Sequence, residues 1–149
     1  VERSRGLGDV YKRQDQRPLI DDLLRPTQLY ASLVLQLLSS NVAIHAMAHI
    51  TGGGLPENLP RCLPAGCRAQ VNPSSWAPPS LFDWLQHAGD IPERDLWHTF
   101  NLGVGFCLVV PEDQTNLAIE TCRAQQLQAW PIGSIVKGNP EDGVIGLPD

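Results

Sequence analysis

Apolar side chains recur at helical spacing early in the chain. Between Leu29 and Leu38 they fall in adjacent pairs four residues apart, which predicts one apolar stripe along an amphipathic helix. Pro26 and Thr27 stand just before this stripe, where helices commonly begin. Residues 41–50 are also apolar but contain two histidines, and their pattern does not separate a strand from a helix.

Proline, glycine and short polar clusters divide the rest of the chain into short elements. The expected helices cover residues 56–63, 80–89 (capped by Ser80), 90–99 and 115–126, the last with Leu117, Ala118, Thr121 and Cys122 inward; the expected strands cover 69–72, 103–110, 130–137 and 143–147. Helices and strands alternate without a strict βαβ repeat. We therefore expect one α+β domain, a mixed β-sheet with helices packed on it.

The composition disfavours several classes of partner. The 149 residues include 11 basic and 16 acidic side chains, a net charge of -5, which disfavours nucleic acid and anionic membrane surfaces. No apolar run reaches the roughly 18 residues of a membrane span, so we expect none. The four cysteines lie outside any Cys-x-x-Cys pair and are expected to be reduced thiols of a cytoplasmic protein.

Residues 1–14 contain basic side chains and glycines with no periodicity. No apolar core of a signal peptide follows them, so no signal peptide is expected. We expect a non-native or disordered leader without chemistry here, and residues 15–149 to form the domain.

The strongest candidate for chemistry is the glycine triplet Gly52, Gly53 and Gly54, which runs directly into a predicted helix start. Three successive glycines are costly unless the backbone needs unusual dihedral angles or another group must approach closely. A helix start offers unpaired N–H donors and about half a positive charge, so it suits a phosphate or carboxylate. The alternative is a plain glycine-rich turn.

Polar side chains around the triplet extend this candidate site. Thr51 offers a hydroxyl, Asn58 an amide and Arg61 a cation one helical turn beyond Asn58. Asn101 precedes a Gly-Val-Gly run, where it either contacts a ligand or caps the end of a strand. This Gly-x-Gly is too short for a dinucleotide-binding fingerprint and follows a helix, so it does not predict a Rossmann site.

Two histidines precede the glycine triplet. His45 and His49 are four residues apart, which in a helix would put both on one face. A zinc protease would need glutamate after the first histidine, where this chain has Ala46, and no third ligand is evident, so we expect no metal site. His49 adjoins the glycines and suits proton transfer, whereas His45 is expected to be a partly buried structural residue.

Taken together, these motifs resemble the phosphoribosylformylglycinamidine cyclo-ligases, also called aminoimidazole ribonucleotide synthetases. The resemblance covers about residues 18–137 and is most specific in the stretch from His45 to Arg61. It corresponds to the C-terminal half of the family. The supporting segments, in the family's order, are residues 26–30, 99–105 and 129–133, together with Trp76 and residues 81–86.

The resemblance implies an activity in de novo purine synthesis. Such enzymes use ATP to close the imidazole ring of formylglycinamidine ribonucleotide, giving aminoimidazole ribonucleotide, ADP and phosphate. It implies a homodimer and an N-terminal domain, outside this chain, with most of the ATP and Mg²⁺ ligands, so the fragment alone is expected to be inactive. His49 would polarise the reacting amide oxygen or move a proton. The glycine turn would hold a phosphate of substrate or nucleotide.

Three positions depart from the family pattern, and two alternatives stay open. Gln28 and His98 stand where arginine is common, and Phe106 stands where methionine is usual. One alternative is a superfamily relative acting on another substrate, although such relatives usually have aspartate where this chain has His49. The other is a non-catalytic module that binds a phosphate-bearing ligand.

Overall fold

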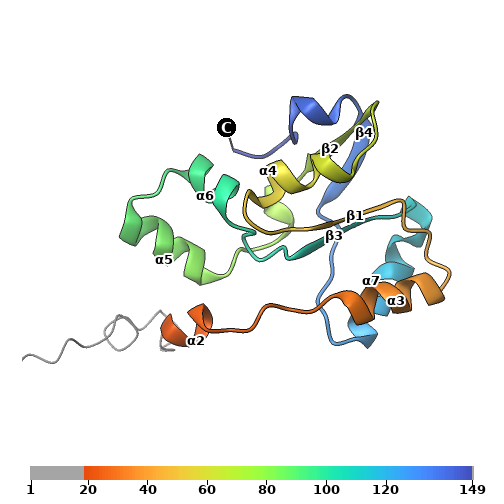
Figure 1. Cartoon of the computed structure of the whole chain (residues 1–149), viewed down its shortest axis with the longest axis horizontal. Helices are drawn as coiled ribbons and strands as arrows, with labels where there is room; N and C mark the ends of the chain where they lie inside the picture. Colours follow the sequence, from red (N-terminus) through yellow and green to blue (C-terminus); the bar gives the residue numbers. More distant parts are fainter. Residues whose placement is uncertain (1–18, 149) are drawn as a thin grey trace, which may run out of the picture.

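The computed structural model describes residues 19–148, so the expected leader, residues 1–14, lies outside the described residues. Helices and strands alternate along the chain, which confirms the α+β class (Figure 1). Short 3-10 turns, η1 to η4, cover Pro60–Cys62, Pro73–Ser75, Glu112–Gln114 and Pro140–Asp142. The helices are α2 (Leu19–Leu23), α3 (Ala31–Ser39), α4 (Gly54–Asn58), α5 (Ser80–Gly89), α6 (Glu93–Thr99) and α7 (Thr115–Ala124); the strands are β1 (Ala46–His49), β2 (Cys67–Val71), β3 (Phe106–Val109) and β4 (Gly133–Lys137).

The strands form two antiparallel pairs where we expected one mixed sheet. β1 pairs with β3, and β2 pairs with β4. The last expected strand, residues 143–147, is reduced to one parallel bridge between Gln70 and Ile145. Gly143 and Gly146 flank this bridge at φ of +77° and +90°, so the backbone leaves the extended conformation on both sides.

The ambiguous segment at residues 41–50 contains strand β1. Its burial alternates, with Ala48 and Ile50 buried and Met47 and His49 exposed. A period of two places successive side chains on opposite faces, and Ala48 and Ile50 join the main core. Pairing with β3 therefore makes this segment a strand, whereas its sequence pattern alone allowed either a strand or a helix.

The predicted helices form, with shifted ends. α3 begins at Ala31, several residues after Pro26, and buries Leu33 and Leu37 while Leu29 is 81% exposed. The helix expected over residues 56–63 begins earlier, at Gly54, and continues after α4 as the 3-10 turn η1, which starts at Pro60. Proline lacks the N–H that would continue the α-helical ladder.

Helices α5, α6 and α7 also match their predicted positions. Pro79 occupies the N-cap of α5, so Ser80 is its first residue and not its cap. Asp90 takes the left-handed conformation after Gly89, with φ of +47°. In α7, Ala118, Thr121 and Cys122 are buried as predicted; the prediction for Leu117 was wrong, since it is 42% exposed.

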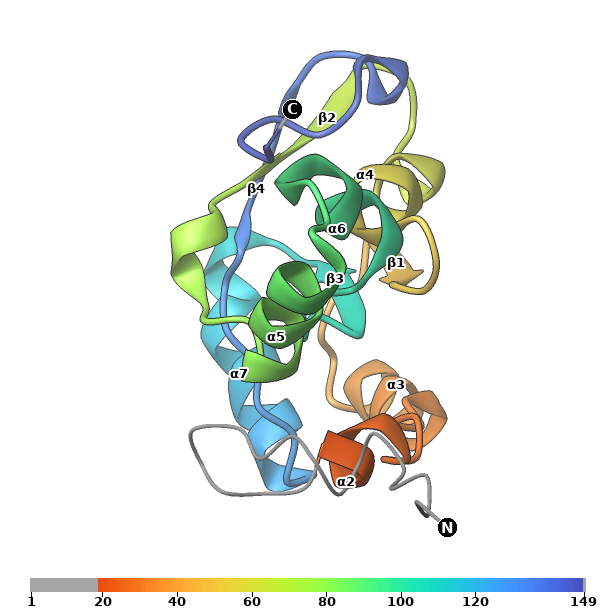
Figure 2. The ribbon, with the colours of Figure 1, turned by 90° about the vertical axis from the view of Figure 1, so that its left-hand side faces the viewer.

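The core has two clusters of buried side chains. The larger one surrounds Ile50, Leu55 and Leu102 and joins β1 to α4 and α6. The smaller one lies between α3 and α7, which run side by side, and includes Leu33 and Leu37. Figure 2 shows α4 against α6, with β1 close by. The segment from β1 to α4 carries the candidate residues. It is therefore held by the larger core at β1 and by α6 at α4.

None of the helices within residues 19–148 combines the length and apolarity needed to span a bilayer. The longest, α5 and α7, have 10 residues each, whereas a span needs about 20.

Gly54 is expected to be the glycine of the triplet on which stability depends. Its φ is +56°, and a Cβ atom there would overlap the carbonyl oxygens of Trp97 and Phe100. We expect Gly54→Ala to lower the free energy of unfolding by about 3 kcal/mol, through left-handed strain and overpacking. At Gly52 a Cβ would meet nothing within 4 Å, so Gly52→Ala should cost less than about 1 kcal/mol. Urea unfolding followed by circular dichroism compares the two, and equal losses would contradict this explanation.

Candidate functional site

The glycine turn, Thr51–Gly54, joins the end of β1 to the start of α4. Its backbone reverses through Gly53 and Gly54, whose φ angles are +90° and +56°. The Gly54 N–H is used internally, since it donates to the Thr51 carbonyl oxygen at 3.1 Å. Neither Gly52 nor Gly53 donates its N–H to an acceptor among residues 19–148. Gly52 is exposed, and the amides of Gly52 and Gly53 are therefore available as donors within the turn.

The side chain of Asn58 stabilises the turn through hydrogen bonds to its backbone. Its buried side-chain Nδ2 donates to the carbonyl oxygens of Gly54 at 2.8 Å and Gly52 at 3.2 Å. Only 7% of Asn58 is exposed. The structure therefore uses the amide nitrogen of Asn58 to fix the carbonyls on one side of the turn.

The carboxylate of Glu57 lies beside the turn, and the sequence analysis gave it no role. The Glu57 side chain lies so close to Gly53 that a Cβ on Gly53 would overlap it. Glu57 also pairs with Arg61, with 3.4 Å between the Arg61 nitrogen and the Glu57 oxygen. An acidic residue three positions after the last glycine was the available signal, because acids favour the first turn of a helix. Arg61 is thus engaged locally, on an exposed surface where such pairs contribute little.

Asn101 shapes a second turn next to the first. Its side-chain Oδ1 accepts from the Gly103 N–H at 3.1 Å, and its carbonyl accepts from the Val104 N–H at 2.9 Å. Gly54 packs on the carbonyl of Phe100, the residue before Asn101. The fold therefore brings the Asn101 turn beside the glycine turn, with the Asn101 oxygen occupied in its own loop.

His49 ends β1 and packs against two aromatic rings. The ring centroids of His49 and Tyr30 are 5.8 Å apart in an edge-to-face arrangement, and those of His49 and Phe106 are 6.1 Å apart. Tyr30 and Phe106 also contact each other, with centroids 5.0 Å apart. We call Tyr30, His49 and Phe106 the aromatic trio. His49 remains exposed, so its imidazole is oriented by neighbours yet open to a ligand.

Tyr30 is a second residue of this site, after Glu57, to which the sequence analysis gave no role. It lies at the N-cap of α3 and passes directly over Gly105, where any Cβ would overlap the tyrosine hydroxyl. Burial, and to a lesser extent the Cys107 thiol, raise the pKa of Tyr30. The signal in the sequence was a single tyrosine within a stripe otherwise made of leucine and valine.

His45 does not share the environment predicted for it. It is exposed, whereas a partly buried residue was expected. In a strand, residues four apart lie on the same face but about 13 Å from each other, so His45 and His49 cannot share one ion. Among residues 19–148, no three His, Cys, Asp or Glu side chains gather into a group that could hold a metal.

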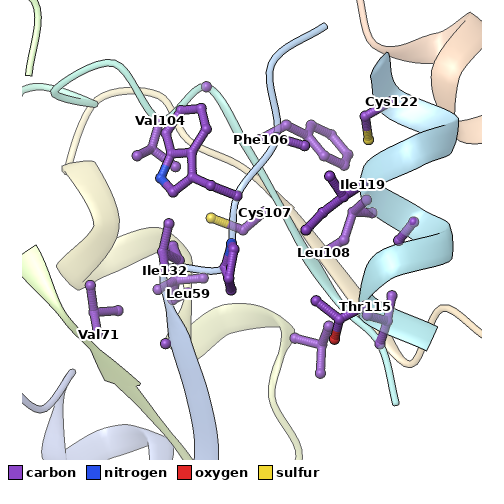
Figure 3. A pocket seen from close by; sticks show the side chains of 18 of the residues that line it. Leu59, Val71, Val104, Phe106, Cys107, Leu108, Thr115, Ile119, Cys122 and Ile132 are labelled. Carbon is purple, nitrogen blue, oxygen red and sulfur yellow. The ribbon is translucent and has the colours of Figure 1, made fainter. Parts of the chain in front are cut away.

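A cavity of about 300 Å³ lies beside the aromatic trio (Figure 3). Tyr30 and Phe106 line it, but the glycine turn does not. The candidate phosphate site and this cavity are therefore different places, and Tyr30 and Phe106 line only the cavity. The lining comes from β2, β3, α7 and the segment leading into β4, and includes Val71, Leu108, Ile119 and Ile132.

All four cysteines are free thiols in the structure. Burial, and then the neighbouring Cys62, raise the pKa of Cys107 to about 12. Burial also raises the pKa of Cys62 and of Cys122. A thiol that resists ionisation is a poor nucleophile, so Cys107 contributes packing to the cavity wall.

The fold and site define an α+β domain with a glycine turn next to an oriented imidazole. The model of the family described as "AIR synthase related protein, C-terminal domain" matches residues 3–146. The chain therefore belongs to this family.

Curated relatives that carry the name phosphoribosylformylglycinamidine cyclo-ligase match most of the chain. The protein from Parasynechococcus marenigrum (strain WH8102) is 83% identical over 135 residues, which are 91% of this chain and 39% of the relative. The protein from Synechococcus sp. (strain CC9605) is 55% identical over 150 residues, 99% of this chain and 44% of the relative. The protein from Prochlorococcus marinus (strain MIT 9313) is 58% identical over 136 residues, 90% and 39% respectively. The chain thus spans about two fifths of these relatives.

The raised pKa of Cys107 predicts slow alkylation in the folded state. An unfolded cysteine ionises near pH 8.5, so at that pH the folded thiol has on the order of 10³-fold less thiolate. In a variant with the other three cysteines replaced by alanine, iodoacetamide should react at least about 100-fold faster in urea than in buffer. Mass spectrometry measures both rates.

The same shift has a consequence for stability. Because the folded pKa is raised, the contribution of Cys107 is complete below about pH 8.5 and is lost as the pH rises toward 12. Cys107→Ala should therefore reduce the alkaline decline in unfolding free energy, and an unchanged decline together with equal alkylation rates would contradict the assignment.

Proposed function

We propose that this chain is the C-terminal part of an ATP-dependent cyclo-ligase that converts formylglycinamidine ribonucleotide to aminoimidazole ribonucleotide, with ADP and phosphate as co-products. Its membership of the family and the names of its relatives support the reaction class. The observation that carries the proposal is that the amides of Gly52 and Gly53 are unengaged, three and four residues after an oriented imidazole at His49. This arrangement suits a phosphate-bearing substrate whose reacting amide reaches the imidazole.

The anion site in this proposal depends on individual amides. α4 has only five residues, so its macrodipole is small and the direct N–H donors provide most of the attraction. The Thr51 hydroxyl adds a further donor at an exposed position. Glu57 opposes an anion, but its carboxylate is half-exposed and paired with Arg61, so it can move aside with its partner. Asn58 holds the carbonyls of the turn away from the anion by using them as acceptors.

His49 supplies proton chemistry in this proposal. Ring closure requires the amidine nitrogen to attack the formyl carbon while the formyl oxygen leaves as phosphate, and the attacking nitrogen loses a proton. An imidazole at this place can donate a hydrogen bond to the leaving oxygen or accept the proton from nitrogen. The edge-to-face contact with Tyr30 restricts the orientation of the ring, which supports a positioned role for this imidazole.

ATP and Mg²⁺ belong to the proposal in different ways. ATP supplies the phosphoryl group that turns the formyl oxygen into a leaving group, and the amides at Gly52 and Gly53 fit a phosphate of either ATP or the ribonucleotide. Residues 19–148 offer no cluster of metal ligands, so no step is assigned to a metal held by this part of the chain. The resemblance to the cyclo-ligases implies a homodimer, which is part of this proposal. The proposed biosynthetic role and the free thiols support a cytoplasmic location.

The role of His49 is tested in a chimera in which residues 15–149 of this chain replace the matched part of the Parasynechococcus relative. We expect His49→Ala to lower kcat of ATP-dependent ring closure by about 10²–10³-fold, since it removes a group aimed at the reacting atoms. His45→Ala is the matched control, because His45 is an exposed histidine that directly precedes β1, and it should leave kcat unchanged. ADP release and product absorbance measure turnover.

Two results would count against the proposal. If a folded chimera had no turnover with formylglycinamidine ribonucleotide, this chain would not serve that reaction. If the His49→Ala and His45→Ala chimeras were equally fast, His49 would have no catalytic role.

A further inference from the structure

The free edge of β3 lies against the cavity. The Ile50 N–H donates to the Gly105 carbonyl at 3.0 Å, and antiparallel ladders alternate, so Cys107 also bonds toward β1. The peptide groups of Phe106 and Leu108 then face the other way. Within residues 19–148 they have no partner on that side. β3 is therefore an edge strand with unpaired donors and acceptors.

β4 is an edge strand for the same reason. The Asn72 N–H donates to the Ile132 carbonyl at 2.8 Å, so Ser134 bonds toward β2 and Ile135 faces away. Among the described residues each sheet thus has two strands, and the bridge to Ile145 is the one contact made by the far edge of β2. Sheets of two strands are marginal, and exposed edges are templates for a further strand.

Apolar side chains from both edge strands, β3 and β4, line the cavity. Leu108 from β3, Ile135 from β4 and Ile119 from α7 all line it (Figure 3 shows Leu108 and Ile119). The cavity is partly open, and its volume of about 300 Å³ is enough to take the apolar side chains of a peptide segment. The Nε1 of Trp130, which also lines the cavity, is buried and has no acceptor among the described residues. Buried donors of this kind normally have a partner.

We propose that an extended apolar segment from the part of the longer relatives that has no counterpart in this chain occupies this cavity and pairs with the free edge of β3. A peptide strand satisfies all three needs at once, since it offers apolar side chains, a ladder for Phe106 and Leu108, and a carbonyl for Trp130. A small apolar ligand would leave the peptide groups unpaired. More than half of each relative lies outside the match, whereas one strand of about five residues is enough.

The test compares amide exchange in this chain with exchange in the chimera described above, and it is independent of turnover. We expect the amides of Phe106 and Leu108 to exchange at least 100-fold more slowly in the chimera, whether or not the chimera is active. The amide of Cys107, already bonded to β1, is the internal reference and should change less. Hydrogen–deuterium exchange read by NMR resolves the three positions.

Two substitutions on one helix give a matched control. Ile119 lines the cavity, whereas Leu117 is exposed on α7 and does not line it. In the chimera, Ile119→Glu should return the exchange of Phe106 and Leu108 to the rate in the isolated chain, and Leu117→Glu should not. Ile135→Lys, on the edge strand β4, replaces Ile119→Glu if circular dichroism shows that variant to be unfolded.

Three outcomes would overturn the proposal. The first is equal exchange of Phe106 and Leu108 in the chain and the chimera. The second is protection of both amides in the isolated chain together with a dimer in sedimentation equilibrium, which would make a second copy the occupant. The third is an equal effect of the Ile119 and Leu117 substitutions.

Discussion

The close approach of Gly54 to the end of α6 is the contact on which the site depends. The backbone of Gly54 lies directly against the carbonyl oxygens of Trp97 and Phe100, a distance that no residue with a side chain permits. This contact seats α4 on α6 and brings the Asn101 turn beside the glycine turn. The internal hydrogen bonds of Asn58 then set the direction of the turn's carbonyls, which leaves the amides of Gly52 and Gly53 unengaged.

Near this contact, a polar surface and an apolar cavity lie in different places. The glycine turn is polar and exposed, whereas the cavity is apolar and lies beneath Tyr30 and Phe106. The aromatic trio forms the boundary, because His49 faces the polar side and its two partners face the apolar side. An imidazole held at such a boundary keeps access to a ligand while its orientation is set by packing. Anion binding and strand addition therefore involve different surfaces of one domain.

The sequence predicted those features that depend on local pattern. Helix α3 with its buried Leu33 and Leu37, three of the four inward positions of α7, and the glycine turn before a helix follow from spacing and are present. The exposed Leu29 and Leu117 are the exceptions. It could not settle β1, because only pairing with β3 distinguishes that strand from a helix. It missed Tyr30 and Glu57, since their roles come from contacts with Gly105 and Gly53 that depend on side-chain placement. The expected mixed sheet is two antiparallel pairs among the described residues, and the last expected strand is reduced to one bridge at Ile145 between two glycines with positive φ.

The central claim is that the unengaged amides of the glycine turn bind an anion beside His49. Titration of the ¹⁵N-labelled chain with inorganic phosphate, followed by NMR, tests it most directly. We predict saturable shifts of the Gly52 and Gly53 amide signals and of the His49 ring protons. Gly66, an exposed glycine with φ of +87° and open space around it, is the reference and should not respond. Shifts as large at Gly66, or none at Gly52 and Gly53, would contradict the account.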